Sequence, residues 1–217
     1  MVSNDTYRSK ADEIVRSIKG SAIQIFERYP NLSHAVRSVL QPRDFRAYCI
    51  GPPKTGTHSI ARVFKSYRSA HEPHFHDFAH WIEGRWQGTI GREEIEDWLV
   101  ERDKFLWLEC ESSHPMVWFS DLIVDLFPES RFIVTIRDCM SWLDSIIDQH
   151  INYRQGGQVR RLEDLFYGSR SGDHQFDTSA QQRVYPLENY LDYWVNHYHR
   201  VLKEAVRDSP PCHTVSN

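Results

Sequence analysis

The chain has 217 residues, of which 40% are hydrophobic and 26% are charged, and its formal net charge is −4. These values are ordinary for a single globular domain, and this length can bury a substantial core. Because 30 acidic residues face 26 basic ones, there is no electrostatic case for nucleic-acid binding. We also expect neither a membrane span nor a secretory signal, since no apolar run is long enough for the first and residues 1–10 lack the apolar core of the second.

The N-terminal part of the chain is predicted to be helical. Ala11 to Tyr29 carry apolar residues at helical spacing, Pro30 and Asn31 break the pattern, and a short second helix runs to Leu40. We expect residues 1–40 to form a helical cap on the main sheet.

A strand, a turn and a helix follow in a layout typical of phosphate-binding loops. Phe45 to Ile50 predict a buried strand, and Ser59 to Tyr67 predict a helix. The turn between them, residues 51–58, therefore lies at a helix N-terminus, where unpaired N–H groups and the helix dipole favour an anion.

The turn departs from the nucleoside triphosphatase pattern G-x-x-x-x-G-K-[ST]. Gly51 and Gly56 fit the glycine spacing, but Thr57 and His58 stand where lysine and a hydroxyl residue should follow, and the lysine lies inside the loop at position 54. Because that hydroxyl normally holds magnesium, its absence argues against a metal-assisted enzyme. A P-loop nucleotide or small-molecule kinase remains the first alternative function.

Strands and helices alternate beyond the turn. We predict strands at Ser69–His71, Phe105–Leu108 and Phe132–Ile136, and helices at Glu93–Arg102 and Val117–Phe127. This alternation predicts an α/β fold in which helices cover both faces of a central parallel sheet, a three-layer α/β/α architecture.

A second anion-binding pattern ends the predicted strand at Phe132–Ile136. Arg137 follows that strand, and Ser145 comes eight residues later in a segment with helical spacing. An arginine at a strand end offers a planar fork to phosphate oxygens, and a serine one or two helical turns on can reach the same anion. Two phosphate sites imply a bisphosphorylated nucleotide.

The two motifs, Pro53-Lys54-Thr55-Gly56-Thr57 and Arg137 with Ser145, resemble the signatures of sulfotransferases that use 3′-phosphoadenosine 5′-phosphosulfate (PAPS). The resemblance spans about residues 47–150 and implies the P-loop NTPase-like sulfotransferase fold in one domain, with a nucleotide-binding core at 45–150. It implies transfer of a sulfuryl group to a hydroxyl of a small-molecule or carbohydrate acceptor, without a metal and in the cytoplasm. A homodimer is compatible with it. Family members continue into a further strand, so we expect a C-terminally shortened member, and a degenerate, non-catalytic nucleotide-binding protein is the second alternative.

The resemblance also implies roles for individual residues. The expected donor-binding residues are Pro53, Lys54, Thr55, Gly56, Thr57, His58, Ser59, Arg137 and Ser145. Lys54 is the natural group for the leaving oxygen, because a cation binds developing charge more tightly than ground-state charge. His58 replaces the threonine or serine common in the family, which leaves its role open.

The general base is less sharply defined by the sequence. His114 lies a little over twenty residues before Arg137, which is close to the spacing of the catalytic histidine in cytosolic family members. In other branches a glutamate serves, so Glu72, Glu109 and Glu111 compete. We rank His114 first and Glu72 second.

The remaining segments add three expectations. Residues 154–186 are rich in Gly, Gln, Arg, Ser and Asp and predict either a lid or acceptor loop or a disordered insertion, whereas 187–207 predict one long helix. His76 and His80 would share a helical face, but Pro73 interrupts the segment, so we expect it to line the acceptor pocket rather than bind a metal. The four cysteines form no C-x-x-C pattern and read as reduced thiols in or near the core.

Overall fold

The structure is a computed structural model that describes residues 41–152, 157–168 and 187–207. The helical cap predicted for residues 1–40 lies outside the described residues. Most of the segment predicted as a lid, namely residues 154–156 and 169–186, lies outside them as well.

The centre of the fold is a parallel sheet of four short strands, in the order β2-β3-β1-β4. The strands are β1 (Ala47–Cys49), β2 (Ser69–His71), β3 (Cys110–Ser112) and β4 (Arg131–Ile133). They are in step, since Ala47 aligns with Cys110 and Arg131, and Ser69 aligns with Cys110. All four carboxyl ends therefore lie at one edge of the sheet, where α/β proteins bind their ligands.

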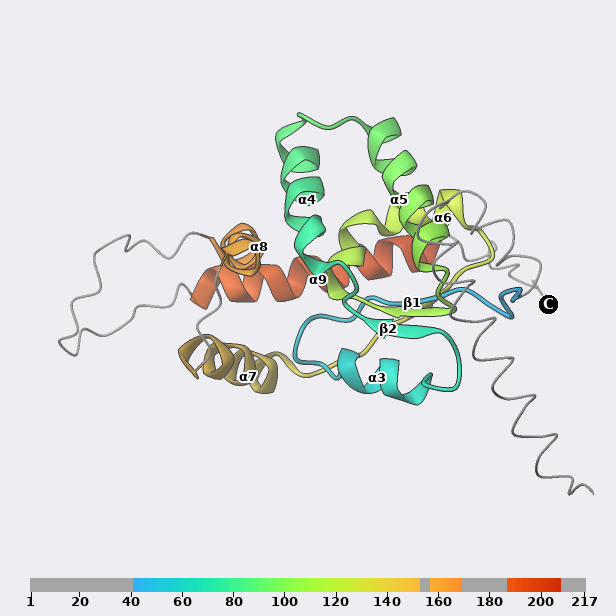
Figure 1. Cartoon of the computed structure of the whole chain (residues 1–217). Coiled ribbons are helices and arrows are strands. Elements are labelled where there is room, and N and C mark those ends of the chain that lie inside the picture. Colours follow the sequence, from blue (N-terminus) through green and yellow to red (C-terminus); the bar gives the residue numbers. More distant parts are fainter. Residues whose placement is uncertain (1–40, 153–156, 169–186, 208–217) are drawn as a thin grey trace, which may run out of the picture.

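Helices cover both faces of this sheet, which confirms the predicted α/β fold. Figure 1 shows α3 on one face, with α4, α5, α6 and α9 on the other. The helical segments are α3 (Thr57–Val63), η1 (Phe75–Asp77), α4 (Phe78–Gln87), α5 (Arg92–Leu106), η2 (His114–Phe119), α6 (Ser120–Leu126), α7 (Cys139–Asn152), α8 (Gly157–Tyr167) and α9 (Leu187–Arg207).

Helix α9 confirms the long helix predicted at the end of the described chain. Its residues Tyr190, Tyr193, His197 and Val201 recur at helical spacing, and all four are buried. Tyr190, Tyr193 and Val201 belong to one hydrophobic cluster with residues of α6, α7 and α8, which includes the fully buried Trp142. The helix thereby reaches the sheet and the site at its edge.

The prediction of a strand at Phe105–Leu108 is wrong. Phe105 and Leu106 form the last turn of α5, which ends where Trp107 adopts a left-handed conformation at φ 49°. The strand lies further on, at Cys110–Ser112, and its pattern is polar rather than apolar. Hydrophobic periodicity did not predict this strand, because its central residue, Glu111, is charged. The residue can be buried only because its charge is compensated inside the fold.

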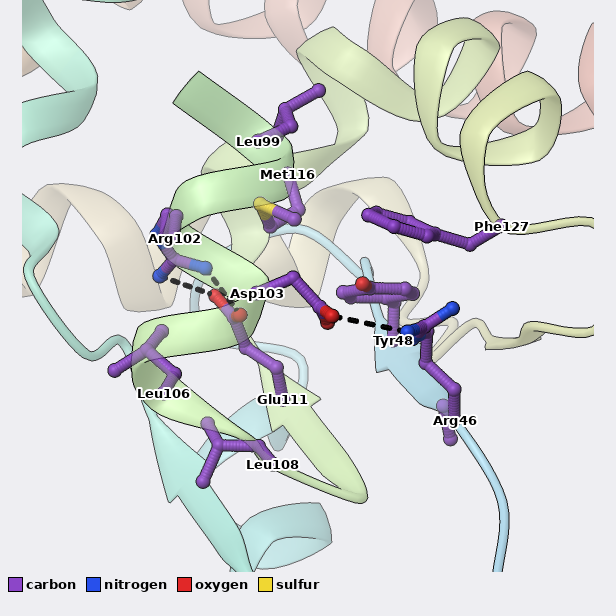
Figure 2. Close-up of a pocket in the computed structure, with 11 residues that line it drawn as sticks. Arg46, Tyr48, Leu99, Arg102, Asp103, Leu106, Leu108, Glu111, Met116 and Phe127 are labelled. Atoms are coloured by element: carbon purple, nitrogen blue, oxygen red, sulfur yellow. Dashed lines mark hydrogen bonds and ion pairs between the residues drawn. The ribbon is translucent and has the colours of Figure 1, made fainter. Parts of the chain in front are cut away.

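Figure 2 shows that compensation. The guanidinium of Arg102 donates two hydrogen bonds to the Glu111 carboxylate, at 2.5 and 2.8 Å, and both side chains are buried. Beside them Arg46 pairs with Asp103 at 3.0 Å. The cavity between these groups measures only about 10 Å³, which is at most one water molecule. These ion pairs are thus part of the packed interior and do not form a ligand-binding site.

Two further predictions need correction. Gly157–Tyr167 lie inside the segment predicted to be irregular, yet they form helix α8. The apolar run Phe132–Ile136 is strand only to Ile133, and Ile136 is exposed. The chain leaves the sheet there because residues 134–137 turn toward the loop after β1, as described below.

Candidate active site

The loop after β1 is held in a fixed shape by its own contacts. Lys54 and Gly56 both adopt left-handed conformations, at φ 65° and 101°. The Thr55 hydroxyl donates to the Pro52 carbonyl at 2.6 Å and lies 2.5 Å from the hydroxyl of Thr135. Lysine at positive φ is strained, and such strain clusters at functional sites.

The loop and the chain after β4 touch at a glycine. A Cβ atom on Gly51 would lie 1.9 Å from the Thr135 hydroxyl and 2.9 Å from its backbone nitrogen. Only glycine permits this approach. The first glycine of the motif therefore brings the loop after β1 against the segment that carries Arg137.

Two side chains from the second motif hold the loop backbone. The guanidinium of Arg137 donates to the Lys54 carbonyl at 2.9 Å, and the indole N–H of Trp142 in α7 donates to the Pro53 carbonyl at 2.8 Å. Helix α7 is itself capped by Asp138, whose carboxylate accepts from the Ser141 N–H at 2.8 Å. The two sequence motifs thus form one structural unit.

Helix α9 fixes the same region from the core. Nε2 of His197 lies 2.6 Å from the Ile50 carbonyl and must donate to it. Burial lowers the pKa of His197 to about 3, even though the bond to Ile50 opposes the shift, so the ring is neutral. The Tyr198 hydroxyl donates to the Thr135 carbonyl at 3.1 Å and accepts from the Arg137 N–H at 3.3 Å.

The predicted site residues gather around one cavity at the carboxyl edge of the sheet, with a volume of about 790 Å³. It opens between the loop after β1, the ends of β2 and β3, and helices α7 and α8. The sequence-predicted residues that line it are Pro53, Lys54, Gly56, Thr57, His58, Glu72, His114, Arg137 and Ser145.

Thr55 and Ser59 are not among the lining residues. Thr55 instead supports the loop through the bonds described above. The Ser59 N–H bonds to the Gly56 carbonyl at 2.9 Å, in the first turn of α3.

Two of the competing bases form a pair in this cavity. Nδ1 of His114 lies 2.7 Å from Oε1 of Glu72. Burial alone would raise the pKa of Glu72, but the charge and hydrogen bond of His114 outweigh it and the pKa is lowered. An ionised carboxylate only accepts, so Nδ1 carries the proton and Nε2 is left as the basic nitrogen.

The other two candidate glutamates have structural partners elsewhere. Glu109 binds the Arg68 guanidinium at 3.1 Å and accepts from the Arg68 N–H at 2.9 Å. Glu111 is paired with Arg102, as shown above. The carboxylate beside His114 is that of Glu72, which adopts a left-handed φ of 48° at the end of β2.

His71 is a site residue that the sequence did not single out. Its Nε2 lies 3.2 Å from the Thr57 hydroxyl, and its ring stacks on that of His58 with centroids 5.0 Å apart. Burial lowers the pKa of His71, which Glu72 opposes and His58 and His114 reinforce. The available signal was the position of His71 at the last residue of a predicted strand, next to the candidate base Glu72.

The wall of the cavity that α7 and α8 form was also not predicted from the sequence. It includes Gln149 and His150 of α7 and Glu163 of α8, together with apolar residues of both helices. The helix α8 was not expected, so its contribution to a site was not visible in the sequence. His76 lines the cavity as well, as expected for the histidine-rich segment.

Across residues 41–152, 157–168 and 187–207, no three His, Cys, Asp or Glu side chains gather in a way that could hold a metal ion. Within the same residues, no helix combines the length and apolar character needed to cross a membrane. Cys49, Cys110 and Cys139 are free thiols, and the first two are buried.

The fold and the site define an α/β protein in which the loop after β1 lacks the lysine–hydroxyl pair of the nucleoside triphosphatases. The family model described as the sulfotransferase domain matches residues 47–209, well over half of the chain. The chain therefore belongs to the sulfotransferase domain family. No curated protein and no solved structure gives a significant match.

Proposed function

We propose that this protein transfers a sulfuryl group from PAPS to a hydroxyl of a small-molecule or carbohydrate acceptor. One observation carries the proposal: the phosphate-binding loop, the pair Arg137 and Ser145, and the pair His114 and Glu72 line the same cavity. The family match supports sulfuryl transfer in general. The donor, the acceptor class and the residue roles below are part of the proposal.

The chemistry of the lining residues fits a bisphosphorylated donor. Arg137 offers a planar guanidinium, and Ser145 offers a hydroxyl from the middle of α7, so together they can bind a phosphate at the 3′ position. Lys54 and the N-terminus of the loop helix would hold the phosphosulfate. When bound, such a donor supplies the sulfuryl group, which passes to the acceptor oxygen as the bond from sulfur to the bridging phosphate oxygen breaks.

Lys54 is assigned the stabilisation of the leaving oxygen. Its backbone is fixed by Arg137 while its side chain is exposed to the cavity. A positioned cation acts most strongly on charge that develops in the transition state, so its contribution should appear in kcat.

His114 is assigned the role of general base. With Nδ1 donating to Glu72, Nε2 can take the proton of the acceptor hydroxyl, and the ionised Glu72 stabilises the imidazolium that forms. The ring is packed by Phe75 and Phe166, with centroids 5.5 and 5.9 Å away. These contacts restrict its rotation and hold the basic nitrogen in place.

The test is a calorimetric titration of the purified chain with adenosine 3′,5′-bisphosphate and, separately, with ATP and magnesium, followed by turnover with radiolabelled PAPS and a mixed panel of hydroxyl compounds. We expect magnesium-independent binding of the bisphosphate and transfer of label. Preference for ATP with magnesium would instead favour a kinase. Bisphosphate binding without any turnover would favour a non-catalytic nucleotide-binding protein.

A further inference from the structure

Charged side chains line the cavity near both ends of helix α7. Among the described residues, the lining cations Lys54 and Arg137 lie at the loop end, and Arg137 stands two residues before the first residue of α7. From the first residue of α7, Cys139, to His150 the helix rises about 16 Å. At that far end Nε2 of His150 lies 3.1 Å from the Glu163 carboxylate. The Glu163 carboxylate therefore lies at the end of α7 that is remote from the loop after β1.

One face of α8 builds the wall at this end. The lining residues of the helix are Val159, Leu162, Glu163, Phe166 and Tyr167. They are spaced at i, i+3, i+4, i+7 and i+8, which is one helical face. Because Phe166 also contacts the His114 ring, an apolar surface runs from the proposed base to the Glu163 carboxylate. Glu163 is thus the charged group within a mostly apolar face.

Glu163 is largely enclosed. Its side chain is 12% exposed, and that of His150 is 1% exposed. Burial raises the pKa of Tyr167 far above its ordinary value, with further contributions from Tyr193 and Tyr190 and then from Glu163 and Glu72. The fields of both cavity carboxylates thus reach the same buried hydroxyl. In such surroundings a carboxylate attracts a cation strongly and repels an anion.

We infer that the part of the cavity between α7 and α8 selects acceptor alcohols that carry an apolar ring and an amine, and that Glu163 is the residue that sets this preference. The inference rests on the proposed function. The ring would pack against Phe75 and Phe166 beside His114, and the ammonium group would bind the Glu163 carboxylate. Carboxylated and sulfated acceptors would be rejected at this end.

Three phenols of similar size test the inference without requiring turnover. Tyramine is cationic, 4-ethylphenol is neutral and 4-hydroxyphenylacetate is anionic. Each is titrated into the full chain with saturating adenosine 3′,5′-bisphosphate, and its Kd is measured by ligand-observed NMR. We expect tyramine to bind about tenfold more tightly than 4-ethylphenol, and the anion to bind most weakly.

Substitution on α8 assigns the preference to one residue. Glu163→Gln should remove the tenfold advantage of tyramine and leave the Kd of 4-ethylphenol within about twofold. The matched control is Asp164→Asn, the same chemical change at the next position, where the carboxylate pairs with Arg160 at 3.9 Å and does not line the cavity. This control should retain the wild-type order of affinities.

The outcomes separate this inference from the proposed function. Failure of the chain to bind the bisphosphate would refute the proposed function. If the chain binds the bisphosphate, three results would overturn the inference and leave the donor site intact. The three phenols could bind with equal affinity, none of them could bind measurably, or all three could lose affinity equally in Glu163→Gln. A merely structural role of Glu163 beside His150 predicts that equal loss.

Discussion

The guanidinium of Arg137 donates a hydrogen bond to the backbone carbonyl of Lys54, across 83 residues of sequence. One bond thereby joins the two motifs that indicated a bisphosphorylated nucleotide. It also gives Arg137 two tasks in the proposed enzyme, to bind the 3′-phosphate and to fix the loop that presents Lys54.

Lys54→Ala should lower kcat by about 10²–10³-fold, because a preorganised charge on the leaving oxygen acts mainly in the transition state. The alanine keeps the same left-handed backbone, so the fold should be retained, and circular dichroism with thermal unfolding checks this. Lys65→Ala, an exposed lysine just after α3, is the control and should behave as wild type. Unchanged turnover in Lys54→Ala would refute the assigned role.

Arg137→Ala should weaken binding of adenosine 3′,5′-bisphosphate by at least about tenfold, since hydrogen bonds to charged groups contribute about 1.5–3 kcal/mol. Adenosine 5′-phosphosulfate, which lacks the 3′-phosphate, should lose much less affinity. Calorimetry with both ligands measures the difference, and Arg131→Ala, an exposed arginine at the start of β4, is the control. Equal losses would mean that Arg137 acts through the loop alone.

The sequence located these motifs because their signals are local. A turn with glycines at positions 51 and 56 between a strand and a helix can be recognised in one short window, as can Arg137 followed by Ser145. The alternation of elements similarly predicted the parallel sheet. In each case the residues that define the pattern lie close together in the chain.

The missed features depend on side-chain contacts that a local hydrophobic pattern does not report. Strand β3 can be polar because Arg102 neutralises Glu111, and hydrophobic periodicity does not predict such a pair. Helix α8 was hidden by flanking glycines and polar residues, although Leu162 and Phe166 bury its inner face. The choice among the candidate bases likewise required the structure, since it depends on Glu72 meeting His114.

His114→Ala should lower kcat by about 10²–10⁴-fold without weakening bisphosphate binding, because a general base contributes to the chemical step. Glu72→Gln should have a smaller effect in the same direction, since it leaves the imidazole in place and removes the charge that stabilises its protonated form. His80→Ala, an exposed histidine on α4, is the control. Steady-state kinetics and calorimetry on the same samples provide both readouts, and full activity of His114→Ala would return the role to Glu72.

His197 should make the free energy of unfolding depend on pH. The folded ring has a pKa of about 3, whereas the unfolded ring has an ordinary value of 6.5, so between these pH values only the unfolded state binds the proton. Stability from this group is complete above pH 6.5 and is lost as pH falls toward 3, by about 1.4 kcal/mol per pH unit.

Urea unfolding of wild type and His197→Gln at several pH values between 4 and 7 measures this dependence. The pH dependence of the glutamine variant should be shallower, because its amide does not titrate, while its N–H₂ group can still donate to the Ile50 carbonyl. His199→Gln, an exposed histidine on the same helix, should keep the wild-type slope. Identical slopes in wild type and His197→Gln would contradict the prediction.

The buried ion pair of Arg102 and Glu111 in Figure 2 connects the stability of the fold to the geometry of the candidate active site. Arg102 also donates to the carbonyl of Pro73, the residue directly after Glu72, at 2.8 Å, so it supports the turn that presents Glu72 to His114. Arg102→Met leaves the Glu111 carboxylate buried without its cation and should cost about 3–5 kcal/mol of stability. The double variant Arg102→Met/Glu111→Leu removes the buried charge and should recover at least half of that loss.

Chemical denaturation of the single and double variants measures the stability change, and kcat of the double variant reports the position of Glu72. We expect the double variant to be folded but slower than wild type, since the bond to the Pro73 carbonyl is still missing. Arg92→Met, an exposed arginine on the same helix, should change neither quantity measurably. A double variant as unstable as Arg102→Met would show that the bond to Pro73, and not the buried charge, dominates the loss.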